Sequence, residues 1–105
     1  MNIAAATLEV ATDSDGPLYR LRGRLDFASV PGLLAGGREV FPANGLVRLD
    51  LGGLNGVNSA GLALLLEWQD DFKRSGRQMK LLNVPATLIN IARVSELESV
   101  LALPV

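Results

Sequence analysis

The sequence predicts an α/β domain in which a mixed sheet of about four strands carries helices mostly on one face, in the order β-β-α-β-α-β-α. Short apolar strands alternate with amphipathic helices after an initial hairpin, a pattern typical of parallel strands joined by helices. The 105 residues and the 49% hydrophobic content suffice for one core and leave little for a second. We therefore expect a single domain over residues 1–105.

The first strands are predicted as a hairpin. Residues 7–11 and 18–25 alternate apolar and polar side chains on either side of a run rich in Asp, Ser, Gly and Pro. In the second strand, Arg20, Arg22 and Arg24 share one face. Such a row could grip an anion, but it more often indicates a solvated sheet face, which is the interpretation we favour.

Helices and strands alternate over the rest of the chain. Ser-Val-Pro at residues 29–31 predicts a helix start, and Asn-Gly at 44–45 ends that helix. The elements that follow are a central strand over residues 46–51, a glycine-rich loop over 52–58, a helix over 59–76, a strand over 79–84, and a helix from Pro85 to about Ser95. The tail, residues 97–105, is apolar enough to pack back on the domain.

The composition excludes several classes of function. Ten Lys and Arg against eleven Asp and Glu give a net charge of -1, without the basic excess that nucleic-acid binding requires. The absence of Cys and His removes disulfides, thiol nucleophiles and imidazole ligands. Six of the carboxylates fall in turns or on polar helix faces: Asp13, Asp15, Asp70, Asp71, Glu96 and Glu98. We therefore expect no catalytic residue, no metal site, no cofactor and no enzyme activity.

No segment is predicted to enter a membrane. Residues 1–7 have neither the basic flank nor the long apolar run of a secretory signal. The apolar run over residues 60–66 is too short to cross a bilayer. We expect a cytoplasmic protein that does not itself insert into a membrane.

The junction of the central strand with the next helix, Asn58-Ser59-Ala60, is the most informative feature of the chain. Ser59 falls where the first helical turn has N–H groups without partners and where the helix dipole adds partial positive charge. A serine at this position either caps the helix or offers its hydroxyl to a phosphate or a partner. Position alone favours the cap.

The helix after this junction is too apolar for a single packed face. A first stripe, from Leu62 to Phe72, is expected in the core. Ala60, Leu64 and Trp68 share a second face, which a neighbouring helix, the tail or a partner protein must cover. We favour a partner, because this face is continuous with the helix start and Trp is a common anchor of interfaces.

Nearly the whole chain resembles the STAS family, on the strength of Leu49-Asp50-Leu51 and the run Asn-Ser-Ala-Gly-Leu at residues 58–62. In the family's anti-sigma-factor antagonists the matching stretch is Asp-Ser-Ser-Gly, and a partner kinase phosphorylates its first serine. Ser59 occupies that place, whereas Asn58 replaces the aspartate and Ala60 the second serine. The resemblance thus implies one possible function, an anti-sigma-factor antagonist switched by phosphorylation of Ser59.

Within that family the chain looks most similar to the MlaB subfamily, through residues 59–68, Asn83-Val84-Pro85 and residues 91–94. These domains are small cytoplasmic subunits of the phospholipid ABC transporter that maintains outer-membrane lipid asymmetry (Mla). The resemblance implies a non-catalytic subunit that binds and supports a MlaF-like ATPase and, through it, reaches the membrane permease at the inner membrane. It implies partner contacts at Asn58, Ser59, Ala60, Leu64 and Trp68.

Overall fold

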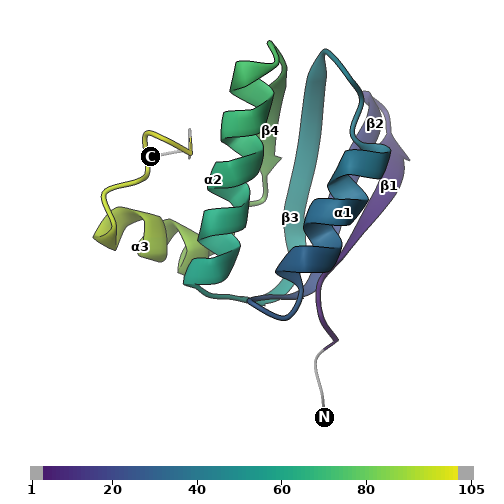
Figure 1. Cartoon of the computed structure of the whole chain (residues 1–105). Helices are drawn as coiled ribbons and strands as arrows, with labels where there is room; N and C mark the ends of the chain where they lie inside the picture. Colours follow the sequence, from purple (N-terminus) through teal and green to yellow (C-terminus); the bar gives the residue numbers. More distant parts are fainter. Residues whose placement is uncertain (1–3, 102–105) are drawn as a thin grey trace.

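A computed structural model describes residues 4–101, and its elements follow the predicted order. The strands are β1 (Thr7–Asp13), β2 (Gly16–Leu25), β3 (Leu46–Val57) and β4 (Gln78–Leu82), and the helices are α1 (Val30–Val40), α2 (Ser59–Arg74) and α3 (Ala86–Val94). The sheet order is β1-β2-β3-β4, with β1 antiparallel to β2 and the other pairs parallel. The predicted mixed sheet is confirmed, with β3 internal and β4 at an edge (Figure 1).

The helices α1 and α2 lie side by side over one face of the sheet, and α3 lies on the far side of α2 from α1 (Figure 1). The sheet contributes Leu21, Leu25, Leu49 and Leu51 to the core, and each of these side chains is 0% exposed. Their alternation with polar residues follows from the period of two in a strand, which places successive side chains on opposite faces.

The end of β3 differs from the prediction. Residues 52–57, expected as a loop, continue the strand and pair with the end of β2. The glycines fit a strand here because the two strands approach closely and their register shifts: a Cβ at Gly53 would lie 2.8 Å from Cγ of Arg22. Glycine inside a strand often marks such irregular pairing. The expected glycine-rich loop was therefore wrong.

The open face of the sheet carries ion pairs. Each of its arginines lies within ion-pair distance of a carboxylate, in the pairs Arg20–Asp50, Arg22–Glu9, Arg24–Asp26 and Arg48–Asp13. The cationic row is thus neutralised within the domain, as expected for a solvated face rather than an anion site.

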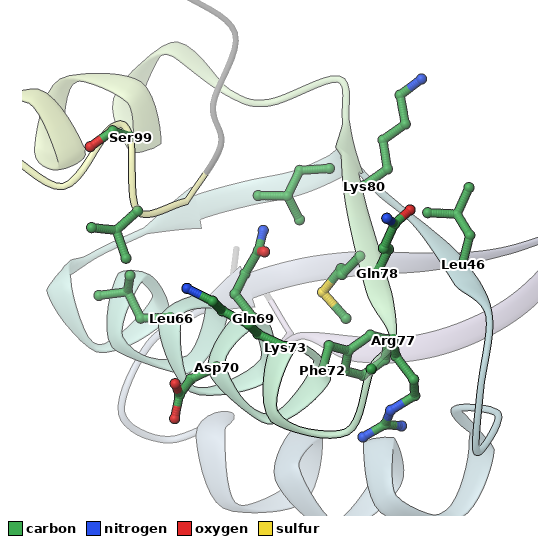
Figure 2. Close-up of a pocket in the computed structure, with 14 residues that line it drawn as sticks. Leu46, Leu66, Gln69, Asp70, Phe72, Lys73, Arg77, Gln78, Lys80 and Ser99 are labelled. Atoms are coloured by element: carbon green, nitrogen blue, oxygen red, sulfur yellow. The ribbon is translucent and has the colours of Figure 1, made fainter.

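The described part of the tail packs on the domain. Leu101 is 0% exposed, and its carbonyl accepts a hydrogen bond of 3.0 Å from Nε2 of Gln69. The rest of the tail, residues 102–105, lies outside the described residues. Between α2, β4 and the segment that contains Ser99 and Val100 lies a groove of about 1030 Å³ (Figure 2). Within residues 4–101, no helix has both the length and the apolarity to span a membrane.

Candidate functional site

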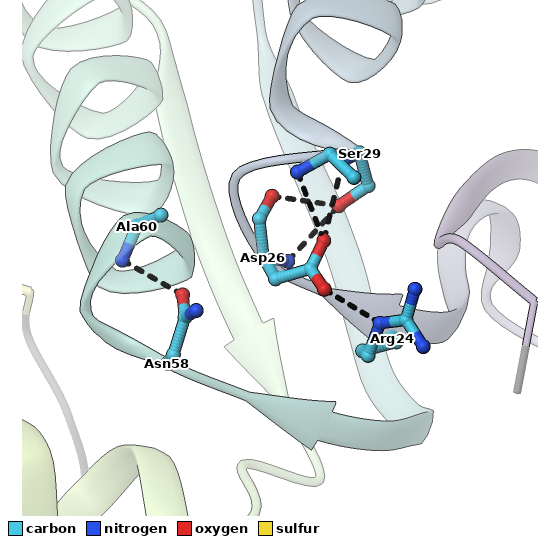
Figure 3. A network of polar contacts seen from close by, with 6 residues as sticks. Arg24, Asp26, Ser29, Asn58 and Ala60 are labelled. Carbon is cyan, nitrogen blue, oxygen red and sulfur yellow. Dashed lines mark hydrogen bonds and ion pairs between the residues drawn. The ribbon is translucent and has the colours of Figure 1, made fainter.

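The start of α2 lies beside the loop that joins β2 to α1 (Figure 3). Leu25 and Val57, the last residues of parallel strands β2 and β3, are paired. The N–H of Asn58 donates to the carbonyl of Leu25 at 3.2 Å. Helices α1 and α2 therefore begin at the same end of the sheet, where the carboxyl ends of β2 and β3 lie side by side.

Asn58, and not Ser59, caps α2. Its backbone is extended (φ -124°, ψ -170°), and its Oδ1 accepts a hydrogen bond of 2.9 Å from the N–H of Ala60. Its carbonyl accepts bonds from the N–H groups of Gly61 and Leu62. The expectation that Ser59 caps the helix was wrong, because the neighbouring amide side chain has that role, as Asn commonly does.

Ser59 is the first residue of α2 and is exposed to solvent. Its hydroxyl makes no hydrogen bond to any of the residues that the structure describes. The first turn of α2 contains no acidic side chain, so nothing there offsets the partial positive charge of the helix start. The hydroxyl is accessible to a partner protein or a kinase, and a phosphate on it would be electrostatically favourable.

Gly61 allows the first turn of α2 to rest on the strand ends. A Cβ at this position would lie 2.7 Å from both Cγ of Leu25 and Cγ2 of Val57. Because carbon atoms in ordinary contact are about 3.5–4.0 Å apart, no larger residue fits without a shift. The glycine of the Ser-Ala-Gly run thereby fixes the position of Ser59 relative to the β2–α1 loop.

A hydrogen-bond network around Asp26 holds that loop (Figure 3). The Ser29 hydroxyl donates to the Asp26 carbonyl and accepts from the Asp26 N–H, both at 3.0 Å. Burial raises the pKa of the Asp26 carboxyl, but bonds from Arg24 and from the N–H groups of Ser29 and Ala28 outweigh burial, so the pKa lies below its ordinary value. A carboxylate thus stands at the start of α1, whereas the start of α2 has none.

Asp26 was not predicted to be a site residue. The signal that could have found it is the Asp-x-x-Ser spacing just before a predicted helix, since both side chains readily bond to nearby backbone groups.

The second apolar face of α2 is buried within the domain. Ala60, Leu64 and Trp68 are 7%, 2% and 4% exposed. The ring of Phe41 meets that of Trp68 edge-to-face at 5.1 Å, and Gly37 brings α1 so close that a Cβ there would lie 3.1 Å from Nε1 of Trp68. The expected exposed Leu–Trp patch is thus corrected: α1 covers Trp68, as the neighbouring-helix alternative required.

Both the β2–α1 loop and the first turns of α2 carry exposed side chains at this end of the sheet. Ala63 lies four residues beyond Ser59 on α2 and is exposed. Phe27, in the β2–α1 loop, is 77% exposed, an unusual state for an aromatic side chain. We call Phe27, Asn58, Ser59 and Ala63 the helix-start surface. The exposure of Phe27 was not predicted, because no periodicity shows which way a loop residue points.

Comparison with known proteins supports one family. The family model described as "Mlab, STAS domain" matches residues 8–103. No curated protein sequence matches the chain. Among solved structures, an antisigma-factor antagonist STAS domain from Rhodobacter sphaeroides is 21% identical, with a TM-score of 0.58 and a match over 75% of this chain and 87% of that one.

Two other solved structures share the fold. The murine Slc26a9 anion transporter is 15% identical over 90% of this chain and 19% of its own, with a TM-score of 0.60. An uncharacterised Shewanella loihica protein with a SpoIIAA-like fold is 9% identical over 91% and 80% of the two chains, with a TM-score of 0.55. On the family match, which spans nearly the whole sequence, this chain belongs to the STAS domain family.

Proposed function

We propose that this chain is a non-catalytic accessory subunit that binds and supports the cytoplasmic ATPase of a Mla-type phospholipid ABC transporter. The description of the matching family model names MlaB, and this role rests on the resemblance to MlaB. The observation that carries the binding site is the free hydroxyl of Ser59, which Asn58 leaves unbonded by capping α2 in its place. Through the ATPase, the chain reaches the permease and lies at the cytoplasmic side of the inner membrane.

The helix-start surface has the composition of a small interface. Phe27 supplies apolar area, and Ser59 supplies a hydrogen-bond donor and acceptor beside the positive end of α2. Exposed aromatic side chains commonly dominate binding energies at such sites. Leu64 and Trp68 do not touch the partner, because they are buried: Leu64 fills the core, and Trp68 packs against α1.

The test is the affinity of the purified protein for a Mla-type ATPase, measured by calorimetry. Phe27→Ala should weaken binding at least about tenfold, because it removes the exposed aromatic anchor. Ser59→Asp and Ala63→Glu should weaken binding similarly, because each places a charged carboxylate on the helix-start surface, which the partner would have to desolvate. All three side chains are exposed, so thermal stability should stay near that of the unaltered protein.

Ser14→Asp is the matched control. Ser14 is exposed in the turn between β1 and β2, at the opposite end of β2 from Leu25. The substitution adds the same charge as Ser59→Asp, and the affinity should not change. Unchanged affinity in all three variants of the helix-start surface would rule out the proposed site.

The second candidate function is an anti-sigma-factor antagonist switched by phosphorylation of Ser59. Exposure of the hydroxyl and the absence of acidic residues in the first turn of α2 favour it, and the fold is shared with an antisigma-factor antagonist. Incubation with an anti-sigma-factor kinase and ATP should then add one phosphate, detected by mass spectrometry. A Ser59→Ala protein that still accepts the phosphate would refute this site.

Affinity purification of the tagged protein from its native cell in mild detergent separates the two functions. Recovery of an ABC ATPase with a permease supports the transporter subunit. Recovery of a small serine kinase or a regulator of sigma factors supports the antagonist and contradicts the first proposal.

A further inference from the structure

The strand β4 leaves backbone groups free at the edge of the sheet. The N–H of Gln78 donates to the carbonyl of Gly45, beside β3, at 3.0 Å. Along a strand, the N–H and C=O groups of successive residues point to opposite sides. Since those of Gln78 point toward β3, the backbone N–H and C=O groups of Met79 and Leu81 point away from β3, toward the open edge. In the part of the chain that the structure describes, no further strand pairs with β4. An added strand could therefore bond to Met79 and Leu81.

An apolar groove runs beside this edge, between β4, α2 and the segment that contains Val100 (Figure 2). Its volume is about 1030 Å³, and it lies along the C-terminal half of α2, away from Ser59. Phe72 and Met79 lie in its lining and are almost fully buried, whereas Leu46 and Val100 are 55% and 58% exposed. Apolar side chains that project from an added strand would thus find apolar contacts.

The charge of the groove selects an acidic occupant. Both lysines of the sequence, Lys73 on α2 and Lys80 on β4, line it and are exposed (Figure 2). Among residues 4–101, neither has an ion-pair partner. The one lining carboxylate, Asp70, is paired with Arg74 at 3.1 Å.

We infer that the β4 edge binds an extended segment of a partner protein in which acidic and apolar residues alternate, so that the segment adds a fifth strand next to β4. Its apolar side chains enter the groove, and its carboxylates lie opposite Lys80 on the open face of the sheet. A second copy of this chain is disfavoured, because antiparallel pairing of two β4 strands about their central residue would bring lysines face to face. This surface is distinct from the helix-start surface.

The probe is a capped synthetic peptide in which glutamate and leucine alternate. On binding, the amide hydrogens of Met79 and Leu81 should exchange more slowly with solvent, because they become hydrogen bonded, and this exchange is measured by NMR. The same peptide with its β4-facing amides methylated keeps its side chains but should not bind. Binding without slower exchange at Met79 and Leu81 would overturn strand addition.

Charge variants test the acidic specificity. The double variant Lys73→Glu with Lys80→Glu should lower the affinity for the peptide about tenfold or more, and added salt should lower the affinity of the unaltered protein. Each single variant, Lys73→Glu or Lys80→Glu, is compared with Arg38→Glu, which reverses one charge on the exposed face of α1, outside the groove, and should leave the affinity unchanged.

The inference would be contradicted if a peptide of alternating lysine and leucine bound as tightly as the glutamate–leucine peptide. It would also be contradicted if the protein formed a concentration-dependent dimer in sedimentation that the peptide dissociates. Ser59→Asp should not alter peptide binding, so failure at this edge and failure of the proposed function are separable.

Discussion

Replacing Gly61 with alanine should destabilise the domain, although alanine is the better helix former. The added Cβ would lie 2.7 Å from Cγ of Leu25 and from Cγ2 of Val57, and 2.9 Å from Cδ2 of Leu25. Leu25 is 0% exposed and its Cγ is a branch point, so it cannot swing aside. Overpacking costs about 1–3 kcal/mol, and three contacts shorter than 3.0 Å place this site in the upper part of that range, at about 2–3 kcal/mol. The higher helix propensity of alanine returns about 1 kcal/mol. The net loss should be about 1–2 kcal/mol.

Gly36→Ala is the matched control, because Gly36 lies in α1 and a Cβ there meets nothing within 4 Å. It should stabilise the domain by about 0.5–1 kcal/mol. In thermal unfolding followed by circular dichroism, Gly61→Ala should lower the melting temperature by about 5–15 °C and Gly36→Ala should raise it by a few degrees. If Gly61→Ala were as stable as Gly36→Ala, the close approach of α2 to the strand ends would be refuted.

Substitutions at three further positions test other contacts of the fold. Asn58→Ala should lower the free energy of unfolding by about 1 kcal/mol through loss of the α2 cap, and Asn58→Asp should not, because a carboxylate accepts the same bond and suits the helix start; urea titration measures both. Trp68→Ala should cost about 3–5 kcal/mol, and the emission of this single tryptophan should resist acrylamide quenching in the folded protein; ready quenching would contradict its burial under α1. Hydrogen bonds from Arg48 lower the pKa of Asp13 from 3.8 to about 2, so their stabilising effect is present above pH 4 and is lost as the pH falls toward 2. Over that range the urea midpoint should fall further in the unaltered protein than in Asp13→Asn, and parallel curves would contradict the pairing.

The order of elements was predictable because their periodicities are local. The alternation of Leu49 and Leu51 with polar residues indicates a strand with one buried face. Pro at residue 31 marks the start of α1, whereas the helix ends at Val40, before the Asn-Gly at 44–45 that was expected to end it. The continuation of β3 through residues 52–57 was not predictable. It depends on a partner strand with which it pairs irregularly, and the sequence presents only the glycines that permit this.

The cover over Trp68 was missed for a related reason. The apolar excess on α2 correctly indicated that a second surface must pack there, but not which surface. Gly37 of α1 and Phe41, the residue that follows the helix, supply it, the first by close approach and the second by ring contact. A helix wheel describes one helix at a time, whereas this contact depends on how the two helices cross on the face of the sheet beneath them.

Asn58 caps α2 and Ser59 does not, and this difference decides how the site can be tested. Because Asn58 supplies the cap, the Ser59 hydroxyl has no structural bond to lose, and substitution or phosphorylation there should leave the fold intact. Any loss of binding in a Ser59 variant then reports on the partner. The same inference is not available at Leu64 or Trp68, since truncating either removes buried contacts and weakens the domain itself. Variants at Ser59 and Phe27, and not at the tryptophan, therefore provide the informative test of what this surface binds.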